Sequence, residues 1–195
     1  MTPAAPHRRR AVGALCLLFA VGCAGTALAQ AQSDFARVFG DPLTRGIRSG
    51  DGDAVRRALI RGYNPSKRYT QDITPLMLAG IGGQPEIAAM LLDYGANIRT
   101  RDKLGNTALI YAAGTGHVEV LKVLLDHGAM IDVRNERGVS ALIQAARNGH
   151  SAAVEELVRR GADVTLTDHT GRSALDWARE NRHQAIVRLL QKERS

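Results

Sequence analysis

The chain has 195 residues, of which 45% are hydrophobic and only 4% aromatic, so Ala, Leu, Val and Gly must fill most of its core. The formal net charge is +7, but three of the arginines lie in an N-terminal segment of distinct composition, and residues 30–195 carry 23 basic and 19 acidic side chains. An excess this small and dispersed does not indicate nucleic acid as a partner, and we expect none.

Residues 1–29 have the pattern of a secretory signal peptide. The basic stretch HRRR precedes an uncharged run from Ala11 to Ala29, which ends in the small residues Ala-Leu-Ala before Gln30. This pattern predicts cleavage between Ala29 and Gln30. The mature protein is then expected in a periplasm or outside the cell, without membrane insertion, and the Ala-rich leader has a bacterial character.

Two alternatives to cleavage after Ala29 remain open. The uncharged run is nearly long enough to span a bilayer, so an uncleaved anchor is one of them. The other is a lipoprotein, because the sequence AVGC places Cys23 after small residues, as in a bacterial lipobox, although Ala20 stands where that motif prefers Leu. Cleavage after Ala29 would remove both cysteines, Cys16 and Cys23, and leave neither a disulfide nor a thiolate metal site.

Residues 30–40 are expected to form an N-terminal capping segment. Phe35, Val38 and Phe39 have the i, i+3, i+4 spacing of a short amphipathic helix. Such a helix can cover the apolar face of the first structural unit.

From Asp41 onward the sequence repeats with a 33-residue period. The repeated residues are Thr74, Thr107, Ser140 and Ser173; Ala79, Ala112, Ala145 and Ala178; Gly50, Gly83, Gly116 and Gly149; and Gly62, Gly95, Gly128 and Gly161. Asp41 lies one period before Thr74 and begins the first unit. The period divides the chain into five units, at about 41–73, 74–106, 107–139, 140–172 and 173–195, of which the last is shortened.

The residue types of each unit predict two helices followed by a loop. Thr, Ser or Asp opens the first helix as an N-cap, and in two units Pro follows at the first helical position. The repeated Ala allows the two helices to approach closely. The second helix carries apolar residues at helical spacing, which in the third unit are Val118, Leu121, Leu124 and Leu125. A glycine then ends this helix.

This pattern resembles that of the ankyrin repeat family, whose repeats have the same period. The resemblance implies an all-α repeat solenoid of about five ankyrin repeats, each a helix–turn–helix with a β-hairpin-like loop, with caps at both ends. One position departs from the family, because the histidine of its TPLH motif is replaced by Met77, Ile110, Ile143 and Asp176. We expect apolar packing to replace the histidine's hydrogen bonds at the first three positions.

The candidate reactive side chains have a structural explanation in this pattern. His117, His150 and His183 are spaced by one period, and stacked repeats would place them along a ridge rather than around one metal ion. The G-x-G sequences lack the lysine and the preceding strand of a phosphate-binding loop, and no nucleophile motif occurs. We therefore expect no catalytic residues, no cofactor and no metal, and the protein is not predicted to be an enzyme.

Two further interpretations concern the loops and the last unit. Asp102, Asn135 and Asp168 recur once per period in the loops, where Asx side chains tie turns. Tyr69 interrupts this series, which predicts an irregular first loop. Trp177 is expected to serve packing in the last unit.

The positions that vary between units predict a protein-binding surface, which is also the function that the resemblance implies. These positions are Lys103, Leu104, Asn106, Glu136, Arg137, Val139, Arg147, Asn148, His169, Thr170 and Arg172. The partner is expected to be another protein, and the chain itself is expected to be a monomer.

Three alternative functions remain at this point. Exported bacterial ankyrin proteins, which the chain resembles, include immunity proteins that block a toxin and helpers of periplasmic oxidative-stress enzymes. Lipidation at Cys23 would instead make an envelope scaffold. A hydrolase or metalloenzyme would need polar groups that converge on one pocket, which the 33-residue pattern does not supply.

Overall fold

A computed structural model describes residues 40–193 and does not describe residues 1–39 or 194–195. The predicted signal peptide, its cleavage site between Ala29 and Gln30, and nearly all of the predicted capping segment lie outside the described residues. Within residues 40–193, no helix combines the length and the apolar character needed to cross a membrane.

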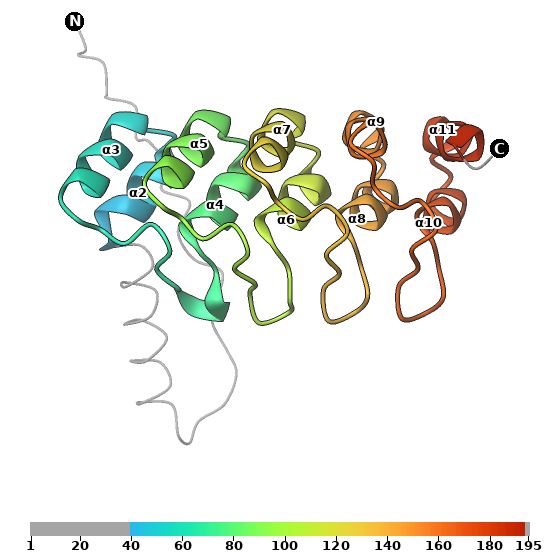
Figure 1. The fold of residues 1–195 in the computed structure, drawn as a ribbon, viewed down its shortest axis with the longest axis horizontal. Coiled ribbons are helices and arrows are strands. Elements are labelled where there is room, and N and C mark those ends of the chain that lie inside the picture. The colour runs from blue at the N-terminus through green and yellow to red at the C-terminus, as the bar shows by residue number, and fades with distance from the viewer. Residues whose placement is uncertain (1–39, 194–195) are drawn as a thin grey trace, which may run out of the picture.

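The described part of the chain is an all-α solenoid of five helix pairs stacked in a row (Figure 1). The inner helices are α2 (Pro42–Ser49), α4 (Pro75–Gly82), α6 (Ala108–Thr115), α8 (Ala141–Asn148) and α10 (Ala174–Glu180). The outer helices are α3 (Gly52–Ile60), α5 (Pro85–Asp93), α7 (Val118–Asp126), α9 (Ser151–Arg159) and α11 (Gln184–Glu193). Each inner helix packs on its own outer helix, and successive inner helices pack on one another. The predicted all-α repeat solenoid is therefore confirmed.

Polar side chains begin the inner helices, as the sequence predicts. The hydroxyl oxygens of Thr74, Thr107 and Ser140 each accept a hydrogen bond of 3.3 Å from the backbone N–H three residues later. In α10, Ser173 and Asp176 form a reciprocal capping box. The acid that departs from the family motif thus stabilises the start of the last inner helix.

Small and aliphatic side chains fill one continuous core between the two rows of helices. The repeated alanines are completely buried, which allows the helices to approach closely: Ala79, Ala112, Ala145 and Ala178. Met77, Ile110 and Ile143 are also buried, so apolar packing does replace the family's histidine at these positions.

The buried stripe of α7 differs in detail from the prediction. Val120 is buried beside Leu121 and Leu124, whereas Val118 and Leu125 are only partly buried. At 100° per residue, Val118 and Leu125 lie at one edge of the stripe and Val120 lies at the other.

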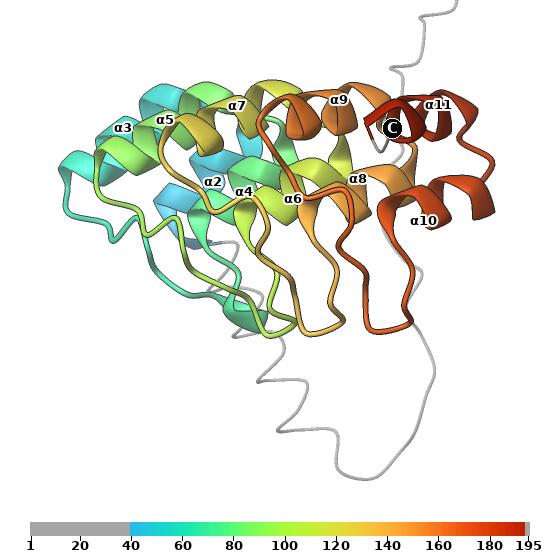
Figure 2. The same cartoon turned by 45° about the vertical axis from the view of Figure 1, so that its right-hand side comes forward.

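Asx side chains hold the second, third and fourth loops, which project to one side of the helices (Figure 2). The Oδ1 atoms of Asp102, Asn135 and Asp168 each accept hydrogen bonds of 2.7–3.1 Å from the backbone N–H groups two and four residues later. Neighbouring loop tips are also joined by backbone hydrogen bonds. In the described residues β-structure is limited to one isolated bridge, between Thr167 and Ser173, so the loops resemble hairpins mainly in their turns.

The first loop is irregular, as the interruption at Tyr69 predicts. A short 3₁₀ helix, η1 (Thr70–Asp72), replaces the regular turn, and both Gln71 and Asp72 have positive φ, of 62° and 59°. The Tyr69 hydroxyl donates a hydrogen bond of 3.0 Å to Oδ2 of Asp41. This contact anchors the loop to the start of α2.

Candidate protein-binding surface

The three histidines of the repeat pattern join neighbouring helix pairs. In His117, His150 and His183, the Nε2 atom lies 2.9–3.2 Å from a carbonyl oxygen near the end of the preceding inner helix. Gln84 makes the corresponding contact in the second pair, where its Nε2 donates to a carbonyl oxygen of α2 at 2.6 Å. No group of three His, Cys, Asp or Glu side chains in residues 40–193 could hold a metal ion. The contacts with carbonyl oxygens of the preceding repeat give the three histidines a structural role.

Two of the loop carboxylates also fix aromatic side chains of the inner helices. Oδ2 of Asp102 accepts a hydrogen bond of 2.5 Å from the hydroxyl of Tyr111, and Oδ2 of Asp168 accepts one of 2.8 Å from Nε1 of Trp177. Burial acts to raise the pKa of both carboxyls, but the hydrogen bonds that they accept outweigh it and lower each pKa. Burial, together with the bond to Asp102, raises the pKa of Tyr111 to about 12. Both carboxylates thus remain ionised anchors.

A groove of about 340 Å³ lies between the loop tips and the inner helices α6 and α8. Its lining, which we call the inner groove, consists of Leu104, Asn106, Ile110, Tyr111, Gly114, Thr115, Arg137, Gln144 and Asn148. Leu104 is 55% exposed although it is apolar, so it presents a hydrophobic side chain at the rim. The groove is shared by two helix pairs.

Most of the residues predicted from their variability lie on this side of the molecule or at the loop tips beside it. The exposed members of the predicted set are Lys103, Leu104, Glu136, Arg137, Asn148, His169, Thr170 and Arg172, and Arg147 is half-buried. Three of them, Leu104, Arg137 and Asn148, line the inner groove directly.

Asn106 and Val139 were predicted as surface residues, but both are buried, with exposed fractions of 7% and 3%. The amide of Asn106 donates to Asp102 and accepts a bond of 2.8 Å from Asn135. Val139 packs into the core. Both follow a turn whose Asx side chain binds their backbone N–H, which turns the chain inward. We therefore assign both residues to the support of the loops, although Asn106 also forms part of the groove wall.

Tyr111 and Gln144 were missed in the sequence. Tyr111, Gln144 and Trp177 occupy equivalent positions in successive repeats, so their different side chains were the available signal. Trp177 packs against the core, as predicted, but it remains half-buried, and the guanidinium groups of Arg147 and Arg172 lie 4.6 and 4.8 Å from its ring centroid. Trp177 lies on inner helix α10, one helix pair beyond the groove.

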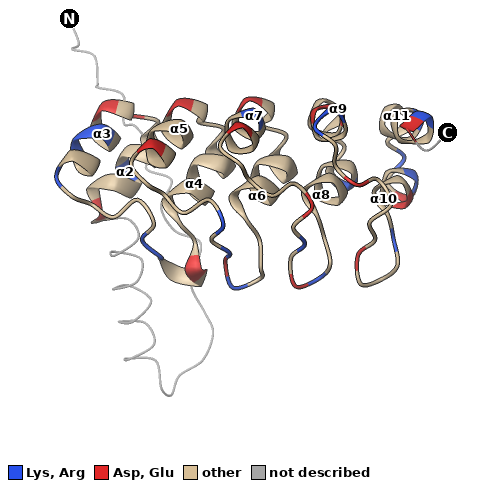
Figure 3. Ribbon diagram, viewed as in Figure 1, with Lys and Arg blue, Asp and Glu red and all other residues tan. Residues whose placement is uncertain are grey.

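Charge is unevenly distributed between the two rows of helices (Figure 3). Helices α4 and α6 contain no charged residue, and α8 contains only Arg147. The outer helices α5, α7 and α9 carry acidic residues instead, among them Glu86, Glu119 and Glu155. The inner groove therefore combines an uncharged floor with one basic group, Arg137, in its lining.

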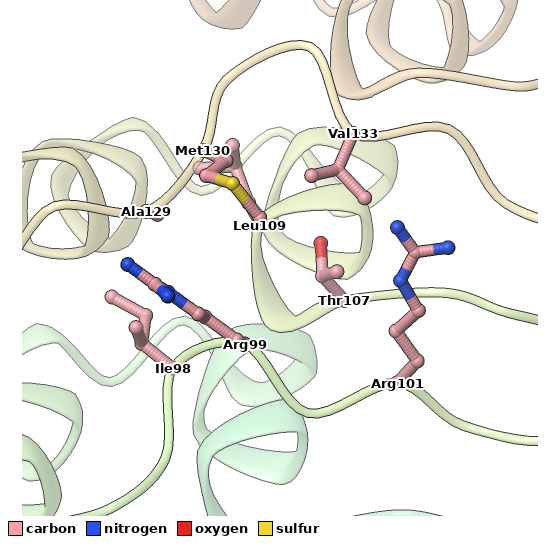
Figure 4. A pocket seen from close by; sticks show the side chains of 8 residues that line it. All are labelled: Ile98, Arg99, Arg101, Thr107, Leu109, Ala129, Met130 and Val133. Carbon is pink, nitrogen blue, oxygen red and sulfur yellow. The ribbon is translucent and has the colours of Figure 1, made fainter.

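A second pocket, of about 20 Å³, lies between the loops that follow α5 and α7 (Figure 4). Its lining residues are Ile98, Arg99, Arg101, Thr107, Leu109, Ala129, Met130 and Val133. This space accommodates about one water molecule, so it is too small for a substrate or cofactor.

Comparison with known proteins identifies similar repeats in proteins of very different size. Seventy residues are 36% identical to potassium channel KOR2 of Oryza sativa subsp. japonica, covering 36% of this chain and 10% of the channel. Seventy-five residues are 35% identical to M-phase phosphoprotein 8 of Rattus norvegicus, covering 37% of this chain and 9% of that protein. The chain therefore spans only about a tenth of the length of these relatives.

A family comparison covers nearly all of the described residues. Residues 43–135 and 128–195 match the sequence profile of ankyrin repeats in three copies. The structure agrees with this match, since it has stacked helix pairs, N-capped inner helices and loops held by hydrogen bonds to Asx side chains. The chain belongs to the ankyrin repeat family, whose repeats are protein-interaction modules.

Proposed function

We propose that this protein is exported and binds another protein through the inner groove and the adjoining Trp177. The observation that carries the proposal is the groove itself, which places exposed Leu104 and half-buried Tyr111 beside Arg137. Tyrosine, tryptophan and arginine are enriched at protein-binding hot spots, and an exposed apolar side chain such as Leu104 adds area that a partner can bury. The solenoid supplies a rigid support for them, so binding requires little ordering of the chain.

Photocrosslinking tests the location of the interface. A photoreactive amino acid replaces Thr115, at the groove, or Glu155, which is exposed on outer helix α9. Cells that make the protein naturally are irradiated, and the covalent adducts are identified by mass spectrometry. We expect a specific protein adduct from position 115 and none from position 155. The same adduct from position 155 alone would place the interface on the outer helices.

Export is supported by the basic stretch, the uncharged run and the Ala-Leu-Ala sequence before Gln30. N-terminal sequencing of the protein from fractionated cells tests this part of the proposal. We expect the soluble envelope fraction to contain a chain that begins at Gln30. A lipidated chain beginning at Cys23 would instead support the envelope scaffold, and a chain retaining the leader inside the cell would contradict export.

A further inference from the structure

We propose that Arg137 and Arg147 recognise side-chain carboxylates in an acidic segment of the partner protein. This inference rests on the proposed function and adds the chemistry of the partner. The arrangement of the two guanidinium groups, the acids around them and the apolar part of the inner groove all support it.

Arg147 is held in a fixed orientation beside the groove. Its guanidinium group lies 4.6 Å from the centroid of the Trp177 ring, and Trp177 is itself fixed by the bond of 2.8 Å from Nε1 to Asp168. Stacking on an aromatic ring occupies the face of a guanidinium group and leaves its in-plane N–H donors available. Arg147 is thus prepared for a bidentate contact with a carboxylate, with little entropy left to lose on binding.

The two arginines have no ion-pair partner within residues 40–193. Arg172, which also lies over Trp177, differs because its Nε is 3.3 Å from Oε2 of Glu180. Arg137 is exposed at the loop tip, on the wall of the inner groove. Arg137 and Arg147 are therefore two guanidinium groups near the groove that are not used by ion pairs within the described residues.

The acids on the inner side are mostly occupied within the fold. Asp102 and Asp168 are buried and accept several hydrogen bonds each, and Asp176 belongs to the capping box of α10. Glu136, exposed next to Arg137, adds one negative charge at the rim. Helices α4, α6 and α8 contribute no carboxylate, and Glu180 of α10 already pairs with Arg172, so a carboxylate of the partner can supply the complementary charge for Arg147.

The uncharged part of the groove defines the rest of the ligand. Leu104 is 55% exposed, and the ring of Tyr111 is held beside it by the hydroxyl contact with Asp102. An apolar side chain can bury area against these two residues while neighbouring carboxylates reach the arginines. The ligand is therefore an exposed segment in which Asp or Glu residues flank a large apolar residue.

Selection from random twelve-residue peptides displayed on phage, with the purified protein as target, tests this inference. We expect enriched peptides to contain Asp or Glu beside Leu, Ile or Phe. The Kd of the most enriched peptide is then measured by fluorescence anisotropy for the protein and its variants. The double variant Arg137→Glu with Arg147→Glu should bind at least about tenfold more weakly. Arg147→Lys, which keeps the charge but loses the planar fork, should give a smaller loss.

The matched control is Arg56→Glu with Arg188→Glu, which changes the net charge equally at two exposed positions on outer helices α3 and α11. This variant should bind within about twofold of the unchanged protein. Circular dichroism and thermal unfolding of all variants confirm that they fold. Enrichment of neutral or basic peptides, no enrichment at all, or equal binding by the two double variants would overturn the inference. The proposed function fails separately, if position 115 yields no crosslinked protein.

Discussion

At the scale of single residues, the repeated histidines and glycines form interlocking pairs across the helix pairs. Gly83, Gly116 and Gly149 have positive φ, and a Cβ on each would lie 2.6–2.7 Å from a ring atom of the following histidine. The 33-residue spacing predicted a structural role for these histidines. It could not predict the carbonyl acceptor, because that atom belongs to the preceding repeat and is reached only when the repeats stack.

Substitution of His150 tests the bond between repeats. His150→Ala removes the contact of 2.9 Å with the Gly114 carbonyl and the packing against Gly116, so we expect a loss of about 1–3 kcal/mol in the free energy of unfolding. His150→Gln should cost less, since Gln84 makes the equivalent bond two repeats earlier in the chain. Urea unfolding of the three proteins gives the comparison. Equal losses for the two variants would contradict a hydrogen-bonding role.

Two effects disfavour a side chain at Gly116, namely its positive φ and its close contact with His150. A comparison with Gly128 separates them. Gly116 and Gly128 have nearly equal φ, of 76° and 81°. Only Gly116 faces a side chain, because Nδ1 of His150 lies 2.6 Å from the position that a Cβ would occupy there. Gly128→Ala should therefore cost about 1 kcal/mol from the backbone alone. Gly116→Ala should cost about 1–3 kcal/mol more, because the histidine must also move. Calorimetric melting of both variants measures the difference, and equal melting temperatures would show that the contact is unimportant.

At the scale of elements, each of three loops is built around an Asx side chain that accepts hydrogen bonds from the loop backbone. In two of these loops the side chain is a carboxylate that also accepts a hydrogen bond from an aromatic side chain. The sequence predicted Asp102, Asn135 and Asp168 as turn residues, because an Asx side chain at a fixed loop position can bind the backbone N–H two residues on. It did not predict their contacts with Tyr111 and Trp177. Those contacts join a loop to a helix nine residues later, and they depend on the direction in which each side chain leaves its helix.

The pair of Asp102 and Tyr111 predicts a specific dependence of stability on pH. The folded pKa of Tyr111, about 12, is above its ordinary value of 10.0, so its contribution is complete below pH 10 and disappears as the pH rises to about 12. At pH 7 the free energy of unfolding of the unchanged protein should be about 1–3 kcal/mol larger than that of the Tyr111→Phe variant. This difference should shrink between pH 10 and 12. Urea unfolding at a series of pH values measures it.

The contribution of Asp102 to stability depends on pH in the opposite direction. The folded pKa of Asp102 is below its ordinary value of 3.8, so its contribution is present above that pH and is lost as the pH falls through the folded value. The stability difference between the unchanged protein and Tyr111→Phe should therefore also shrink below pH 3.8. A difference that stays constant from pH 3 to pH 12 would show that the hydroxyl does not bind the ionised carboxylate.

At the scale of the whole molecule, the 33-residue period predicted the stack of helix pairs, because each helix start, core alanine and loop turn recurs at that interval. The residues that line the proposed binding surface were predicted less completely. Variability marked Leu104, Arg137 and Arg147, but it also marked Asn106 and Val139, which are buried. Variation along a sequence does not reveal whether a side chain points into a loop or away from it, and only the stacked structure separates the two.

Hydrogen–deuterium exchange, with and without the partner identified by crosslinking, can decide whether the inner groove is the binding surface. We predict that the partner slows exchange in α6, α8 and the loop segments 102–106 and 135–139, and leaves the outer helices α7 and α9 unchanged. Slower exchange confined to α7 and α9, with α6, α8 and the loops unaffected, would contradict binding of the partner at the inner groove.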